Sequence, residues 1–153
     1  MEVFEFPVTI EDEELPKGRS TATGAGAARQ ISRYGGLCVV LIHPNILEHK
    51  LAFEKGFVEG VRSFAWFGSV AQFGDWWAAR DQVGVDVVRM AGRFQVELTV
   101  PRVVLGLTLE VPVGWHVESK GSSVKGIVQQ GTVVTLPALQ GRQTVVFKPS
   151  SPA

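Results

Sequence analysis

Residues 37–45, LCVVLIHPN, decide the fold predicted for the first half of the chain. Six apolar residues in a row are followed there by His43, Pro44 and Asn45. A short run of Val, Leu and Ile between Gly35-Gly36 and Pro44 is typical of a strand that is buried on both faces of a parallel sheet. Ligands and catalytic side chains gather at the carboxyl ends of such strands. His43 is therefore the first candidate functional residue.

The composition excludes several classes of protein. The chain has 153 residues, of which 45% are hydrophobic and 20% charged, as in a globular protein of one or two domains. Fifteen acidic side chains balance fifteen basic ones, so the long-range field that nucleic-acid binding uses is missing and we expect no nucleic-acid partner. The sequence also lacks a signal-peptide pattern and any apolar stretch near ~18 residues, which predicts no membrane span. The lone cysteine, Cys38, leaves the compartment undetermined.

Three strand–helix units are predicted before residue 84. The strands are expected at 3–10, 37–42 and 64–68, and the helices at 21–34, 45–63 and 69–82. Gly35-Gly36 supplies the stop of the first helix, and Ser69 with Gln72 has the spacing of a capping box. The small residues at 24–29 are better explained by close helix packing than by a phosphate-binding turn.

From Val83 onward the pattern changes to short β-branched segments separated by glycine and proline turns, which is typical of a β-sandwich. There are seven segments: VGVDVVRM, RFQVELTV, GLTLEV, WHVES, KGIVQQ, TVVTL and QTVVF. Alternation in the second predicts that Phe94, Val96, Leu98 and Val100 share one face. The predicted class is α/β plus all-β: three βα units of a partial (β/α) barrel over 1–84, an antiparallel β-sandwich over 85–148, and a loose tail at 149–153.

A three-stranded parallel sheet is incomplete by itself, because both of its faces need cover and both edges are unpaired. Three explanations follow. The sheet packs on the β module, it pairs with another copy of the chain, or its partner strands belong to the N-terminal half of a longer parent protein. We favour the third.

Three segments together resemble the C-terminal part of NodB-type polysaccharide deacetylases, which are metal-dependent carbohydrate esterases built on a distorted β/α barrel. They are FEFPVTIEDE at 4–13, GGLCVVLIHPN at 35–45 and SFAWFGSVAQFGDWWAARDQV at 63–83. The resemblance covers residues 1–84. Leu41-Ile42-His43 matches the family's Leu-x-His motif, which implies that Leu41 lines the pocket for the acetyl methyl group and that His43 is the general acid toward the leaving amine.

The resemblance also implies an acidic residue that follows the preceding strand and tunes this histidine. Asp12, or failing that Glu11, occupies the comparable place. Two tryptophans are candidates for substrate binding: Trp66 at a pocket mouth and Trp115 as a sugar-stacking platform. Packing within a strand is the alternative for Trp66, and a place in the sandwich core is the favoured alternative for Trp115.

The family uses a divalent, zinc-like metal, but its Asp-Asp, His-x-x-x-His and arginine motifs are absent from this chain. A catalytic metal needs several ligands that converge on one point. The three histidines, His43, His49 and His116, do not provide this, so we expect no complete metal site in this chain alone. The predicted function is a C-terminal fragment of a carbohydrate N-deacetylase that is inactive alone. The alternative is a noncatalytic carbohydrate-binding or interaction module.

Overall fold

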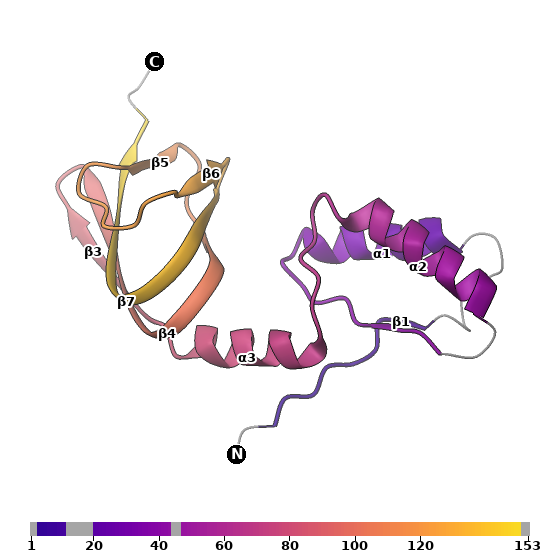
Figure 1. The fold of residues 1–153 in the computed structure, drawn as a ribbon. Helices are drawn as coiled ribbons and strands as arrows, with labels where there is room; N and C mark the ends of the chain where they lie inside the picture. The colour runs from indigo at the N-terminus through magenta and orange to yellow at the C-terminus, as the bar shows by residue number, and fades with distance from the viewer. Residues whose placement is uncertain (1–2, 12–19, 44–46, 151–153) are drawn as a thin grey trace. The chain divides into compact units, whose positions relative to one another are not determined.

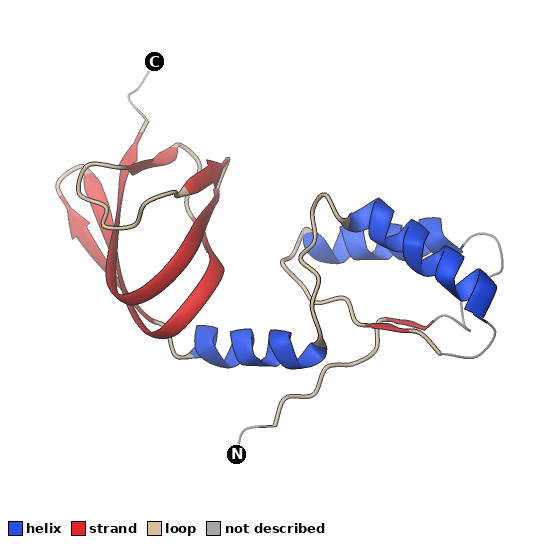
Figure 2. Ribbon diagram, viewed as in Figure 1, coloured by secondary structure: helices blue, strands red, loops and turns tan. Residues whose placement is uncertain are grey.

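The computed structural model describes residues 3–11, 20–43 and 47–150. The chain divides into two compact units, Met1–Gln72 and Phe73–Ala153. Figures 1 and 2 show that the first unit is mainly helical and that the second is built mainly of strands. The chain is therefore a mixed α/β protein whose sheet structure is mostly antiparallel.

The first unit combines two helices with a very short parallel sheet. Strands β1 (Ile10–Glu11) and β2 (Val40–Leu41) pair in parallel, and helix α1 (Ser20–Ser32) lies between them in the sequence. Helix α2 (Leu47–Val61) packs against α1. Within the described part of this unit, the small hydrophobic core contains five buried side chains: Ile10, Ala28, Phe53, Phe57 and Val61.

Small residues allow the two helices to approach closely. A Cβ atom added at Gly24 would lie 3.3 Å from Cδ2 of Phe57 and 3.5 Å from Cε2 of Phe53. The predicted packing role of the glycine-rich stretch is thus confirmed at Gly24. The predicted stop of α1 is confirmed too, because Gly35 has a φ of 63° and the amide of Gly36 donates to the carbonyl of Ile31.

The predicted strands of the first unit are only partly formed. Of residues 3–10 only Ile10 lies in a strand, and of residues 37–42 only Val40 and Leu41 do. The expectation of a strand buried on both faces was wrong, because Val40 is half-buried and Leu41 is 40% exposed. The run is apolar, but two residues of parallel pairing do not place it in the middle of a sheet.

The third predicted strand, at 64–68, is also wrong. The amides of Phe64 and Ala65 both donate to the carbonyl of Val61, at 3.1 Å. These bonds close the C-terminal turn of α2, and residues 65–69 continue as a loop. Because α2 takes up the first amides of the segment, they are not available for a sheet.

Helix α3 (Val70–Asp81) begins where the capping box predicted. The amide of Ser69 donates to Oε1 of Gln72 at 2.8 Å, and the amide of Gln72 donates to Oγ of Ser69 at 3.2 Å. This reciprocal pair satisfies two donors at the helix start. Further along the helix, Nε1 of Trp76 donates to the carbonyl of Leu105 at 2.8 Å.

The sheet of the second unit has five strands in the order β3-β4-β7-β5, with β6 paired to β7. The strands are β3 (Gly84–Met90), β4 (Arg93–Glu110), β5 (Trp115–Glu118), β6 (Val128–Gln130) and β7 (Val133–Pro149). All pairings are antiparallel. The seven predicted segments become five strands because β4 continues past Pro101 and β7 continues past Gly141.

A bulge allows the two long strands to continue through residues that normally end strands. The β4–β7 register shifts between Val100 and Val104, and Pro101 lies in that interval. Gly141 pairs with Val100 and has a φ of 71°. The predicted alternation is confirmed, since Val96, Leu98 and Val100 are all buried and Phe94 is partly buried against the same core.

Candidate functional site

A histidine and a carboxylate meet at the carboxyl ends of the two parallel strands. Glu11 is the last residue of β1, and His43 follows the end of β2 by two residues. Nε2 of His43 lies 3.7 Å from Oε1 of Glu11, and the two side chains are 34% and 33% exposed. The contact is too long for a hydrogen bond, and it becomes an ion pair when the imidazole is protonated.

The sequence prediction named Asp12 first and Glu11 second as the acidic partner of His43. Asp12 lies outside the described residues, and the contact that the structure describes is the one with Glu11. Leu41 pairs with Glu11 in the β1–β2 register and is 40% exposed. Glu11, Leu41 and His43 are thus brought to one end of the small sheet.

This arrangement has the components of acid–base chemistry. Imidazole and carboxylate groups are the side chains that enzymes use most often for proton transfer. Within the described ranges, no group of three or more His, Cys, Asp and Glu side chains could hold a metal ion. His49 is exposed on α2, whereas Nε2 of His116 in β5 lies 2.6 Å from Oγ of Ser150.

Trp66 occupies a different environment from the one expected. It lies in the loop at 65–69 and is 66% exposed. A Cβ atom added at Gly68 would fall 2.0 Å from Cη2 of this indole, so the ring covers the backbone of Gly68. The residue is therefore not part of a barrel strand.

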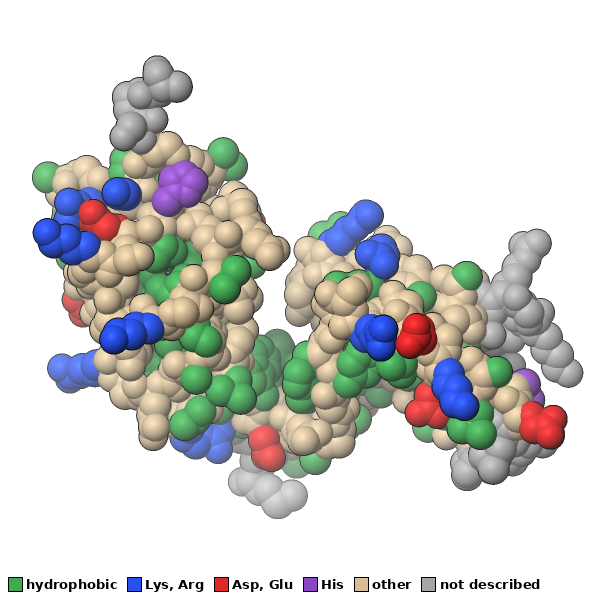
Figure 3. All heavy atoms as spheres, turned by 45° about the horizontal axis from the view of Figure 1, so that its top comes forward, with side chains coloured by type: hydrophobic (Ala, Val, Ile, Leu, Met, Phe, Trp, Pro, Cys, Tyr) green, Lys and Arg blue, Asp and Glu red, His purple; other side chains and the backbone are tan. Residues whose placement is uncertain are grey.

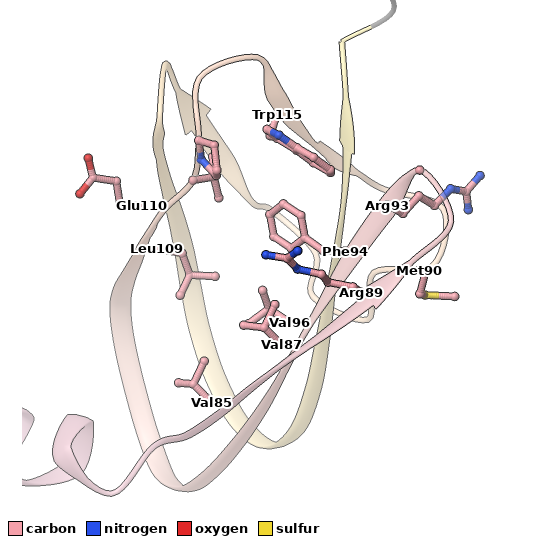
Figure 4. Close-up of a pocket in the computed structure, with 13 residues that line it drawn as sticks. Val85, Val87, Arg89, Met90, Arg93, Phe94, Val96, Leu109, Glu110 and Trp115 are labelled. Atoms are coloured by element: carbon pink, nitrogen blue, oxygen red, sulfur yellow. The ribbon is translucent and has the colours of Figure 1, made fainter.

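Trp115 lies in the second unit, at a hollow of about 630 Å³. The hollow is bounded by β3, by the start of β4 and by residues 109–112 (Figure 4). The ring centroids of Trp115 and Phe94 are 4.7 Å apart, and the two planes are tilted by 49°. Trp115 thus packs against the core of the second unit and also lines the hollow.

Sequence reasoning missed the other residues that line this hollow. Val85, Val87 and Arg89 alternate along β3 and all face it (Figure 4). The sequence predicts VGVDVVRM only as one of the short β-branched segments, and nothing in it shows that one face of this strand is left open.

No helix in the described ranges has both the length and the apolar character needed to cross a membrane. Comparison of the chain with protein-family models, with curated proteins and with solved structures finds no match.

Proposed function

We propose that the first unit is part of a deacetylase-like β/α barrel, that the second is an accessory β-sandwich, and that His43 is the general acid of carbohydrate N-deacetylation. The observation that carries this proposal is the 3.7 Å contact between Nε2 of His43 and Oε1 of Glu11. It lies at the carboxyl ends of neighbouring parallel strands, which is where β/α proteins place catalytic groups.

The chemistry assigned to His43 is proton donation. When the C–N bond of an acetamido group breaks, the departing amine must gain a proton, and an imidazolium near neutral pH can supply it. The carboxylate of Glu11 stabilises the protonated ring before the transfer. Leu41 offers an apolar surface beside the pair, suited to the methyl group of the acetyl moiety.

The resemblance to deacetylases brings with it a divalent metal that polarises the amide carbonyl and activates water. The described residues do not form a site for such an ion. We therefore assign to this chain only the acid–base pair and the acetyl-binding surface, with carbohydrate as the substrate.

Sugar binding at this pair is testable without metal. We expect a chitin-type oligomer of N-acetylglucosamine to shift the ring NMR signals of His43 and to leave those of His49, the exposed histidine of α2, unchanged. The fully deacetylated oligomer is the matched control ligand, because it lacks the methyl group that Leu41 would contact. Equal shifts from both oligomers, or no shift at saturating sugar, would contradict the proposed role.

The rival function is a noncatalytic carbohydrate-binding module, favoured by the position of Trp115 at the hollow of the second unit. The two functions differ in which variant loses sugar binding. Leu41→Asp weakens oligomer binding if the proposed site is correct, whereas Trp115→Phe weakens it if the rival is correct. Isothermal titration of both variants against the wild-type chain separates them.

A further inference from the structure

Strand β3 is an open edge of the sheet. Its seven residues pair with β4 alone among the described strands, and every one of them is exposed. An edge strand of this length presents a row of backbone donors and acceptors to a further strand. Asp86 and Arg89 are the charged residues on it.

The face of β3 that carries Val85 and Val87, here called the inner face, is apolar at these two residues but is not covered by other described side chains. Val85 pairs with Leu98 and Val87 with Val96, so each stands beside a buried residue on the same face of the sheet. Nevertheless Val85 is 52% exposed and Val87 is 62% exposed. The space above them is the hollow of about 630 Å³. Hydrophobic side chains also reach the surface of the second unit in the space-filling view (Figure 3).

One positive charge at the hollow is uncompensated. Arg89 pairs with Phe94 in the register and extends into the hollow (Figure 4), and it forms no ion pair with another described residue. The charge of Arg93 is compensated, since Nη1 lies 3.1 Å from Oε2 of Glu118, an ion pair without hydrogen-bond geometry. Glu110 also lines the hollow, but its carboxylate is directed away from Arg89 (Figure 4).

We propose that this groove binds an extended peptide segment that adds to β3 as a further strand. Such a segment would pair its backbone with the free edge, place alternate apolar side chains over Val85 and Val87, and bring one carboxylate to Arg89. Strand addition of this kind takes affinity from main-chain hydrogen bonds and specificity from alternate side chains. A small apolar anion could fill the hollow and pair with Arg89, but it would leave the backbone groups at the edge of β3 without hydrogen-bond partners.

A second copy of the chain is a less suitable partner for this groove than an acidic peptide segment. If β3 of one copy paired antiparallel with β3 of a second copy about a two-fold axis, the inner faces of both strands would lie on the same side of the joined sheet. Asp86 pairs with Glu97 on the outer face, so the acid of one copy cannot reach Arg89 of the other, which lies on the inner face. Charge complementarity therefore favours a different, acidic segment.

The test uses the full chain and a fluorescent eight-residue peptide of alternating valine and threonine in which one valine is replaced by glutamate. Fluorescence anisotropy measures its binding. We expect Val87→Lys to weaken binding by at least about tenfold, which corresponds to ~1.4 kcal/mol. Val88→Lys is the matched control, because Val88 pairs with Gln95 on the opposite face and is 43% exposed. Arg89→Glu should also weaken binding, whereas Arg142→Glu should not.

Several results would overturn the inference. The first is that the wild-type chain does not bind the peptide at millimolar concentration. The second is that Val88→Lys weakens binding as much as Val87→Lys does. The third is that N-methylation of alternate peptide amides leaves the affinity unchanged. Sedimentation that reveals a dimer dissolved by Val87→Lys would assign the groove to a second copy instead. Circular dichroism of each variant distinguishes loss of binding from loss of folding.

Discussion

The two units of the chain are stabilised in different ways. Of the nine largest fully buried side chains among the described residues, Val61 alone lies in the first unit, and the other eight lie in the β-strands of the second. The strands of the first unit have two residues each, whereas β4 has 18 and β7 has 17. The first unit therefore depends on the contact between α1 and α2, and the second on a continuous sheet. The proposed acid–base pair lies in the less extensively packed unit.

The largest effect is expected from a cavity-forming substitution in the core of the second unit. Phe147 is fully buried and its ring lies 4.7 Å from that of Phe94. We expect Phe147→Ala to lower the free energy of unfolding by about 3–5 kcal/mol, measured by urea denaturation and tryptophan fluorescence. Val128→Ala, at a residue that is 53% exposed, is the control. A loss no greater than the control's would contradict the importance of this core.

The corresponding change in the first unit is Val61→Ala. Val61 is 1% exposed in the small helical core. We expect a loss of about 2 kcal/mol, seen as an earlier transition in far-ultraviolet circular dichroism, to which the helices contribute most. Tryptophan fluorescence reports mainly on the second unit, which contains Trp76, Trp77 and Trp115, because Trp66 of the first unit is already 66% exposed in the folded chain. We expect the main fluorescence transition to stay unchanged. A shift of both transitions together would show that the two units unfold as one.

Two glycines of α1 sharpen the comparison within the first unit. Gly24 faces Phe53 and Phe57, whereas a Cβ atom at Gly26 would meet nothing within 4 Å. We expect Gly24→Leu to destabilise the helical transition by about 1.5 kcal/mol through overpacking. Gly26→Ala should stabilise it by about 0.5–1 kcal/mol, because alanine favours a helix. Effects of the same sign would contradict the described helix contact.

A smaller effect is expected at the start of α3. Ser69→Ala removes the acceptor of the Gln72 amide and should cost about 1 kcal/mol. Ser63→Ala, at an exposed serine before the loop, is the control. Thermal melts of both variants measure the difference, and equal melting temperatures would show that the capping box contributes nothing to stability.

The last test uses the single cysteine as a reporter of the first unit. Burial raises the pKa of the Cys38 thiol above its ordinary value, and the thiolate is the reactive form. We expect alkylation by iodoacetamide to accelerate at a higher pH in the folded chain than in urea. Because the folded pKa is raised, the thiol stabilises the fold below its unfolded pKa, and this contribution is lost as the pH rises through the folded pKa. Identical pH profiles would contradict the described burial.

The sequence predicted best those features that depend on short-range patterns. The alternation of Val96, Leu98 and Val100, the capping pair Ser69 and Gln72, and the stop at Gly35 each follow from local geometry. It predicted strand pairing poorly, because an apolar run does not show which other segment of the chain it pairs with or over how many residues. Of the strand predicted at 37–42, the structure therefore forms only Val40–Leu41.

The strand count failed for a related reason. The sequence predicts turns at Pro101 and Gly141, but a bulge accommodates a proline that lacks a backbone donor, and glycine tolerates the positive φ opposite it. At the candidate site, the sequence predicted Asp12 first and Glu11 second as the acidic neighbour of His43. The structure describes Glu11 at 3.7 Å from the imidazole, and Asp12 lies outside the described residues.

The bulge between Val100 and Val104 has a consequence for how the second unit opens. The strands β4 and β7 pair on both sides of it, from Phe94–Phe147 to Glu110–Val133, but residues 101–103 have no partner in the ladder. Amide hydrogen exchange should therefore be fastest at this interruption and slower in the paired segments on either side of it.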